Sequence, residues 1–277
     1  MTTPSFIGIG AEKCGSTWLH NLLREHPKIY MPLRRKELNF FNLNYEKGLE
    51  WYESFFPNMQ DAACYDALGE ISPRYLNFPE SASRIYTVKS IKKLIVILRN
   101  PVDRAYSHYG HIVRLHGYNK SFDEFILDYP NTITNGLYSQ NLNYFLKYFD
   151  RGQIHCLIFE EAVNALDSTK KEIADFLEVQ DDEFPKAAGL KKSNETYVPK
   201  FRQLNIITSR TTSYLRSLNL DWAVNTAKLI GFKKIIKIGS KKLVPMSTES
   251  RLHLKDIYAQ DIEKLEEQLE INLDIWR

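Results

Sequence analysis

Two glycines, a lysine and two hydroxyl side chains lie close together near the N-terminus, in the segment GAEKCGSTW at 10–18. An apolar run precedes this segment and a helical pattern follows it, which predicts a turn between a strand and a helix. Backbone N–H groups at a helix N-terminus carry partial positive charge, so such a turn can bind a phosphate or a sulfate. Gly15 lets the backbone approach the anion closely, while Ser16 and Thr17 add hydroxyl donors. Lys13 adds a full positive charge.

The two glycines have the spacing of the nucleotide-triphosphate loop G-x-x-x-x-G-K-[ST]. Here Ser16 stands where that loop has its lysine, and the lysine lies inside the loop at position 13. The apolar run KLIVILR at 93–99 ends in an arginine, whereas a magnesium-dependent kinase needs an acidic residue at such a place. The loop is therefore predicted to bind an anion without a metal. A turn that binds no ligand is the alternative.

A second group of anion-binding side chains follows that apolar run. Arg99 ends the run, at the edge where open α/β sheets bind ligands. Ser107 lies about two turns into the next helix. An arginine and a hydroxyl together suit a second, separate phosphate. The alternative is that Arg99 pairs with a carboxylate such as Asp103.

Short apolar runs alternate with helical patterns along the chain, which predicts an α/β fold with a mainly parallel sheet. The predicted strands cover residues 6–10, 69–72, 93–99 and 153–159. The predicted helices run from Ser16 to about Glu25, from Pro101 onward with Asn100 as N-cap, and near 121–128, 137–149 and 162–177. A last helix has one apolar stripe, which indicates a core-facing side, formed by Leu254, Tyr258, Ile262, Leu265 and Leu269.

The composition of the 277 residues is that of a globular protein, with 43% apolar and 26% charged residues. No linker or repeat divides the chain, so residues 1–277 are expected to form a single domain. A net charge of +3 gives no indication of nucleic-acid binding. The three cysteines are too widely spaced for a disulfide framework or a zinc site, which suits a reducing compartment. Without a signal sequence or a membrane-spanning run, the chain is expected to be cytoplasmic.

Residues 222–248 contain six lysines and neither aspartate nor glutamate. Such a segment can be a solvated helix face. It can also be a basic lid that binds the acceptor or a membrane surface.

The first anion motif, within FIGIGAEKCGSTWL at 6–19, resembles the 5′-phosphosulfate loop of sulfotransferases that use 3′-phosphoadenosine 5′-phosphosulfate (PAPS). The second, LIVILRNPVDRAYSHY at 94–109, resembles their 3′-phosphate motif, in the same order and at a similar separation. KELNFF at 36–41 and GEISPRYL at 69–76 resemble segments of the glycan-type branch, and the C-terminal helix resembles that of bacterial members. The similarity covers nearly the whole chain.

The resemblance implies a P-loop-like central parallel sheet flanked by helices and an enzyme that releases adenosine 3′,5′-bisphosphate (PAP). It implies that the 5′-phosphosulfate is bound by Lys13, Cys14, Gly15, Ser16, Thr17 and Trp18. Arg99 and Ser107 would bind the 3′-phosphate, and Tyr138 would lie near the nucleotide. Asn194 and Lys200 would belong to a closing loop.

Sulfuryl transfer needs in-line positioning and stabilisation of the charge on the leaving group. Lys13 is the predicted group for that charge. Glu37, in KELNFF, is the predicted general base. The rings of Phe40 and Phe41 are expected to line the site and to raise the pKa of the Glu37 carboxyl. A surface acid without a role is the alternative for Glu37. A histidine base from the second motif is another, with the candidates His108, His111 and His116.

The chain departs from the glycan-type pattern at Ile71, where a lysine often follows the glutamate of GE-x-SP. We expect Lys36 or Arg74 to supply the missing cation. The predicted acceptor is a hydroxyl of a glycan or of a small molecule, with N-sulfation as a further option. A P-loop-like nucleotide kinase and a non-catalytic PAP-binding protein are the competing functions.

Overall fold

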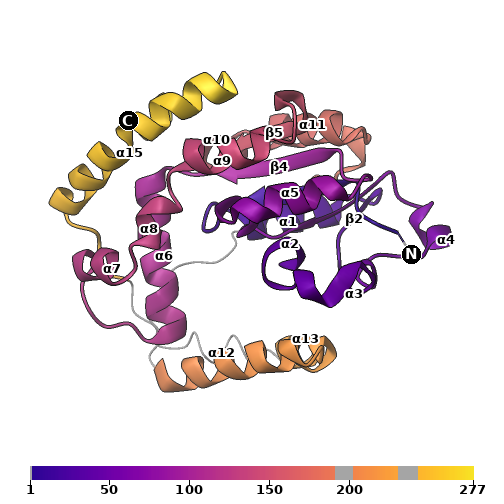
Figure 1. Cartoon of the computed structure of the whole chain (residues 1–277), viewed down its shortest axis with the longest axis horizontal. Helices are drawn as coiled ribbons and strands as arrows, with labels where there is room; N and C mark the ends of the chain where they lie inside the picture. The colour runs from indigo at the N-terminus through magenta and orange to yellow at the C-terminus, as the bar shows by residue number, and fades with distance from the viewer. Residues whose placement is uncertain (1, 191–201, 230–242) are drawn as a thin grey trace.

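A computed structural model describes residues 2–190, 202–229 and 243–277. Within them one sheet of five parallel strands has the order β2-β3-β1-β4-β5, and helices surround it (Figure 1). The strands are β1 (Phe6–Gly10), β2 (Ile29–Tyr30), β3 (Ala67–Ile71), β4 (Lys93–Leu98) and β5 (Ile154–Ile158). Because β1 lies between β3 and β4, the segments that follow these three strands meet at one edge of the sheet. The predicted α/β fold is confirmed.

Helices make up most of the remaining described structure. They are α1 (Ser16–Glu25), α2 (Phe40–Leu43), α3 (Gly48–Glu53), α4 (Met59–Ala62), α5 (Pro79–Thr87), α6 (Pro101–His116), α7 (Phe122–Asp128), α8 (Asn131–Thr134), α9 (Tyr138–Leu146), α10 (Phe159–Asn164), α11 (Leu166–Leu177), α12 (Arg202–Ser217), α13 (Asp221–Leu229) and α15 (Thr248–Leu269). Within the described residues, no helix has both the length and the apolarity to cross a membrane.

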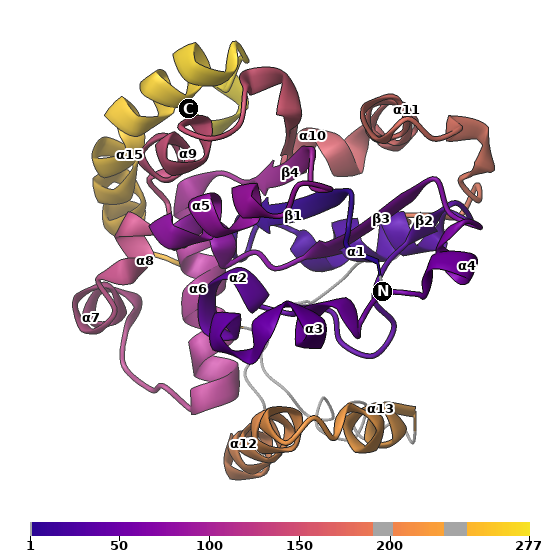
Figure 2. The ribbon, with the colours of Figure 1, turned by 45° about the vertical axis from the view of Figure 1, so that its right-hand side comes forward.

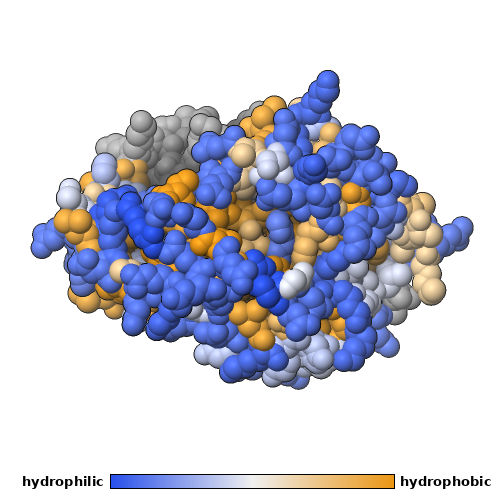
Figure 3. Space-filling model, turned by 90° about the horizontal axis from the view of Figure 1, so that it is seen from above, coloured by the Kyte–Doolittle hydropathy of each residue, from blue (hydrophilic) through white to orange (hydrophobic). Residues whose placement is uncertain are grey.

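Both faces of the sheet are buried, and the side chains of β4 alternate between them. Leu94, Val96 and Leu98 belong to the core formed with α5, α6, α9 and α15. Ile95 and Ile97 belong to the opposite core, formed with α1 and α11. Parallel strands that are covered on both faces need apolar side chains at every position, which explains the unbroken apolar run in this part of the sequence. The view from above shows polar side chains over most of the outer surface (Figure 3).

The sequence located the main strands and helices correctly. All five residues of the predicted stripe on α15 are buried, at exposures of 9% or less, so this face belongs to the core. The expected helix at 162–177 is instead two helices, α10 and α11, which break at Ala165 in a non-helical conformation. Strand β2 and the helices α2, α3, α4, α5, α8, α12 and α13 were not predicted.

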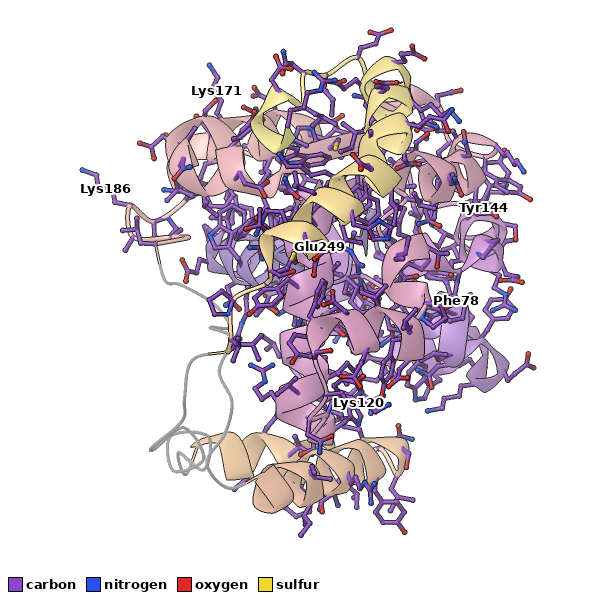
Figure 4. The ribbon with its side chains drawn as sticks, turned by 90° about the vertical axis from the view of Figure 1, so that its left-hand side faces the viewer. Phe78, Lys120, Tyr144, Lys171, Lys186 and Glu249 are labelled. Carbon is purple, nitrogen blue, oxygen red and sulfur yellow. The ribbon has the colours of Figure 1, made fainter. Side chains whose placement is uncertain are left out.

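The helices α12 and α13 lie apart from the sheet, and α12 contacts α6 (Figures 1 and 2). Figure 4 shows this pair below Lys120, which follows the end of α6. The expected basic lid at 222–248 begins on α13, but its residues 230–242 lie outside the described residues. The lid and the single-domain organisation of 1–277 both stay predictions.

Candidate active site

The turn between β1 and α1 has the geometry of an anion-binding loop. Gly15 is the N-cap of α1 and has a φ of 102°, in the left-handed region that favours glycine. A Cβ atom here would lie only 2.4 Å from the ring of Phe159. No side chain caps the helix. The backbone of its first turn is therefore oriented to donate hydrogen bonds to a bound phosphate or sulfate.

A tyrosine hydroxyl connects this loop to the second predicted anion site. Tyr138 Oη lies 3.2 Å from Cys14 Sγ and donates a hydrogen bond of 2.8 Å to the backbone oxygen of Arg99. The side chains of Cys14 and Tyr138 are fully buried, and burial raises the pKa of the Cys14 thiol to about 11. The loop backbone is also joined to β4, because Ala11 N donates to Ile97 O at 2.7 Å. The structure thus brings the two sequence motifs together at one edge of the sheet.

Lys13 lies in the middle of the first loop, half-buried and with a φ of 72°. Burial lowers the pKa of its ammonium group to about 8, and the charge of Arg114 acts in the same direction. The carboxylates of Glu12 and Glu37 oppose this shift. Lys13 and Glu37, the two predicted catalytic residues, are therefore close enough to interact electrostatically.

Lys36 connects the loop to the predicted base. Its Nζ donates to Thr17 Oγ1 at 2.8 Å and to Glu37 Oε1 at 3.0 Å. The other proposed cation, Arg74, stacks on the ring of Phe78 with its Cζ 5.7 Å from the ring centre. Lys36 is thus the cation in contact with both the anion loop and Glu37.

The segment after Glu37 is fixed by side chains from the end of β3. Asn39 N donates to Ser72 Oγ at 2.9 Å, and Phe40 N donates to Tyr75 Oη at 2.8 Å. Ser72 Oγ in turn donates to Glu70 Oε2 at 2.8 Å. Glu70 is completely buried, and burial raises its pKa to about 8. Sequence reasoning used this segment only for its resemblance, although a glutamate at the end of a buried strand was a signal that it has a specific role.

The rings of Phe40 and Phe41 belong to the core. They contact each other, with ring centres 5.0 Å apart, and both contact Tyr52. Glu37 itself is partly exposed, with 37% of its side-chain surface accessible. The two rings therefore anchor the segment from inside, while the carboxylate reaches the surface.

At the second site, the carboxylate of Glu160 faces Arg99. Its Oε1 lies 4.0 Å from Arg99 Nε and also accepts a hydrogen bond of 3.0 Å from Asn100 N. Asp103, the expected partner, pairs instead with Arg251 at 2.9 Å. Ser107 lies half-buried on α6. Arg99 thus directly follows the C-terminal end of β4, and Ser107 lies on the helix that begins two residues later.

Two of the three candidate histidines are close to Lys13. His108 Nδ1 lies 2.9 Å from Thr132 Oγ1. Burial, assisted by neighbouring cations that include Lys13, lowers the pKa of His108 to about 3 and also strongly lowers that of His111. Both imidazoles are therefore neutral at neutral pH. His116 is the last residue of α6.

Trp18 is buried in the core, and its Nε1 donates to Gly189 O at 2.8 Å. Its indole thus holds α1 against the chain near residue 189. Asn194 and Lys200 lie outside the described residues.

Comparison with known proteins agrees with this geometry. A family model for the sulfotransferase domain matches residues 3–216. Over 118 residues the chain is 38% identical to the membrane-associated sulfotransferase kil1 of Dictyostelium discoideum. The aligned region covers 43% of this chain and 25% of that protein. Over 171 residues the chain is 34% identical to the human bifunctional heparan sulfate N-deacetylase/N-sulfotransferase 2. The aligned region covers 54% of this chain and 19% of that protein.

A solved structure, that of a sulfotransferase from Alicyclobacillus acidocaldarius, superposes with a TM-score of 0.72 at 24% identity and covers both chains completely. This likeness shows a shared fold. The chain belongs to the sulfotransferase domain family. The chain thus has the family that its two anion motifs predicted. It spans a quarter or less of the length of the two curated relatives named above.

Proposed function

We propose that this protein transfers a sulfuryl group from PAPS to a hydroxyl of a glycan or of a small molecule and releases PAP. The observation that carries the proposal is the position of Lys36, whose ammonium group contacts both the Thr17 hydroxyl of the anion loop and the Glu37 carboxylate. A sulfuryl group bound at the loop would thus lie beside a carboxylate that can accept a proton.

In the proposed reaction the acceptor oxygen forms a bond to sulfur while the bond between sulfur and the bridging oxygen breaks. The electron pair of the broken bond stays on the 5′-phosphate of PAP. Lys13 stabilises the negative charge that develops there, and the N–H groups at the start of α1 stabilise the phosphate oxygens. Glu37 accepts the proton that the acceptor hydroxyl loses. Lys36 holds the Glu37 carboxylate next to the loop, because it donates hydrogen bonds to both Glu37 and Thr17.

The donor site is tested by thermal shift with PAP, ATP and ATP–Mg²⁺, since a ligand that binds the native state raises the melting temperature. We expect stabilisation by PAP and a much smaller effect of ATP, with or without magnesium. A larger shift with ATP–Mg²⁺ than with PAP would favour the nucleotide kinase.

Catalysis is tested by the release of PAP from PAPS in the presence of acceptors such as p-nitrophenol and simple glycosides. We expect Glu37→Gln to lower kcat by about 10²–10⁴-fold, the range for general-base catalysis, while PAP binds unchanged. If Glu37→Gln keeps most of the activity, the base is another residue. If no acceptor supports PAP release although PAP binds, the protein is a PAP-binding protein without catalytic function.

We further propose that the reaction takes place in a reducing compartment such as the cytoplasm. The support is that Cys14, Cys64 and Cys156 are all free thiols.

A further inference from the structure

A small cavity lies next to the anion loop and has no role in the chemistry described above. Its volume is about 250 Å³. Three segments supply its walls, namely the anion loop, the turn after β3, and α8 with the residue that follows it. The side chains relevant here are Glu12, Arg74, Asn77, Phe78, Asn131 and Asn135. Figure 4 shows Phe78 near the right-hand edge of the molecule, in the view in which α15 faces the reader.

The cavity adjoins the proposed reaction centre. Glu12 directly precedes Lys13 in the loop, and its charge is among those that act on the Lys13 ammonium group. Arg74, which also lines the cavity, lowers the pKa of His108 through its charge, as Lys13 does. The cavity therefore borders the loop that carries Lys13.

The lining of the cavity is polar and has no net charge. The carboxylate of Glu12 and the guanidinium of Arg74 offset each other. Asn77, Asn131 and Asn135 contribute amides, which both donate and accept hydrogen bonds.

One of these amides has an unused acceptor. Asn77 Oδ1 is buried and has no hydrogen-bond partner among the described residues. A buried acceptor without a partner costs about 1–3 kcal/mol, and a ligand hydroxyl would relieve this cost if the Asn77 side chain turned its oxygen toward the cavity. The ring of Phe78 adds an apolar surface at the same cavity. Hydroxyl-binding amides next to an aromatic ring suit a sugar, which has hydroxyls at its edge and C–H groups on its faces.

The volume and the charge limit the ligand further. Cavities that enclose drug-sized ligands measure roughly 300–1,000 Å³, so this smaller one fits a single ring. A sulfated or carboxylated ring would need positive charge in excess, whereas Glu12 offsets Arg74 here. We propose that this cavity is an acceptor subsite for one uncharged, polyhydroxylated ring, such as a neutral sugar residue. This inference rests on the proposed sulfuryl transfer.

Binding is tested separately from catalysis, by saturation-transfer NMR on the enzyme saturated with PAP. The probes are methyl β-D-glucopyranoside and its anionic counterpart methyl β-D-glucuronide. We expect saturation transfer to the glucoside and at least fivefold less to the glucuronide. Asn135→Leu and Asn77→Leu should each reduce the signal of the glucoside at least threefold. Asn143→Leu, at an exposed amide of α9 that contacts Gln268, is the matched control and should leave it unchanged.

A charge reversal provides the complementary test. Glu12→Lys should make the glucuronide the better ligand, because the cavity would then have an excess of positive charge. The inference is overturned if the wild type prefers the glucuronide, or if the cavity variants bind the glucoside as well as Asn143→Leu does. An unchanged PAP-induced thermal shift in each asparagine variant shows that the variant is folded, and a cooperative thermal unfolding transition shows it for Glu12→Lys.

Activity separates this inference from the proposed function. PAP release with p-nitrophenol, together with an absence of glucoside binding, overturns the subsite and leaves the sulfuryl transfer intact. Glucoside binding with no PAP release from any acceptor overturns the sulfuryl transfer.

Discussion

The guanidinium of Arg35 and the carboxylate of Asp221 form a two-pronged ion pair inside the protein. Arg35 Nε lies 3.0 Å from Oδ1 and a terminal nitrogen lies 2.8 Å from Oδ2, and the same nitrogen donates to the backbone oxygen of Arg216. Both side chains are at least 90% buried. Arg35 directly precedes Lys36 and Glu37, whereas Asp221 is the first residue of α13. The ion pair therefore connects the segment that carries the proposed base to the helices α12 and α13.

Removing one partner of this pair leaves the other charge buried. We expect Asp221→Ala to lower the free energy of unfolding by roughly 3–5 kcal/mol, measured by urea denaturation. Replacing both residues, as in Arg35→Met with Asp221→Leu, should cost less than the sum of the single changes, because no unpaired charge remains. Lys120→Ala breaks an exposed pair with Asp128 and is the control, for which little change is expected. Additive single changes would contradict this prediction.

The binding of PAP should weaken at alkaline pH. The pKa of Lys13 is lowered to about 8, so the ammonium group loses its proton as the pH rises through this value. The phosphates of PAP are fully ionised before that point, since their second pKa lies near 6. We expect an increase in the Kd of PAP of about tenfold between pH 7 and pH 9, measured by isothermal titration. Lys13→Arg keeps its charge and should show a flat profile, and an equally steep profile in this variant would rule out Lys13 as the cause.

Glu70 should make stability dependent on pH. Its pKa rises from an ordinary value of 4.5 to about 8 in the folded protein. Its contribution to stability is therefore complete below about pH 4.5 and is lost as the pH rises through 8. Glu70→Gln keeps a neutral acceptor for Ser72, so its stability should fall less over this range. Melting temperatures from pH 4.5 to 8.5 test the prediction, which fails if the two proteins change in parallel.

The anion loop should not tolerate a side chain at Gly15. Alanine there would have an unfavourable φ and would clash with Phe159. We expect Gly15→Ala to lower the free energy of unfolding by roughly 1–3 kcal/mol and to abolish the PAP-induced thermal shift. Gly152→Ala is the matched control, since its Cβ would have no neighbour within 4 Å. A normal response to PAP in Gly15→Ala would show that the loop is not the phosphate site.

Lys36 and Arg74 should affect different kinetic parameters. Lys36 contacts Glu37, so Lys36→Met is expected to lower kcat at least tenfold with p-nitrophenol, an acceptor too small to need the sugar subsite. Arg74 lines the neighbouring cavity, so Arg74→Met should leave that kcat within about threefold and raise the KM of a glucoside. Equal losses of kcat in both variants would mean that both cations act on the reacting groups.

The sequence predicted the sheet because β4 is an unbroken apolar run and short apolar segments alternate with helical patterns, and it predicted α15 because its apolar stripe is regular. It did not predict α12, whose exposed Tyr214 and Ile207 interrupt any clear separation of apolar and polar faces. It also missed the break at Ala165, where the helical pattern itself continues.

The candidate site was predicted as far as local motifs extend. The loop around Lys13 and the strand end at Arg99 are each readable from neighbouring residues. The hydrogen bond of Trp18 to Gly189 and the contact of Lys36 with Thr17 join distant parts of the chain, and no local pattern contains that information. The burial of Glu70 likewise depends on tertiary packing.

The shared hydroxyl of Tyr138 has a consequence for the energetics of donor recognition. It links Cys14 to the backbone of Arg99 and so fixes the separation between the two proposed phosphate-binding ends. Little ordering of the protein then remains to be done upon association, so less of the intrinsic binding energy is consumed by loss of conformational freedom. A template of fixed length also disfavours nucleotides whose phosphates have another spacing, which makes rigidity itself a source of donor selectivity.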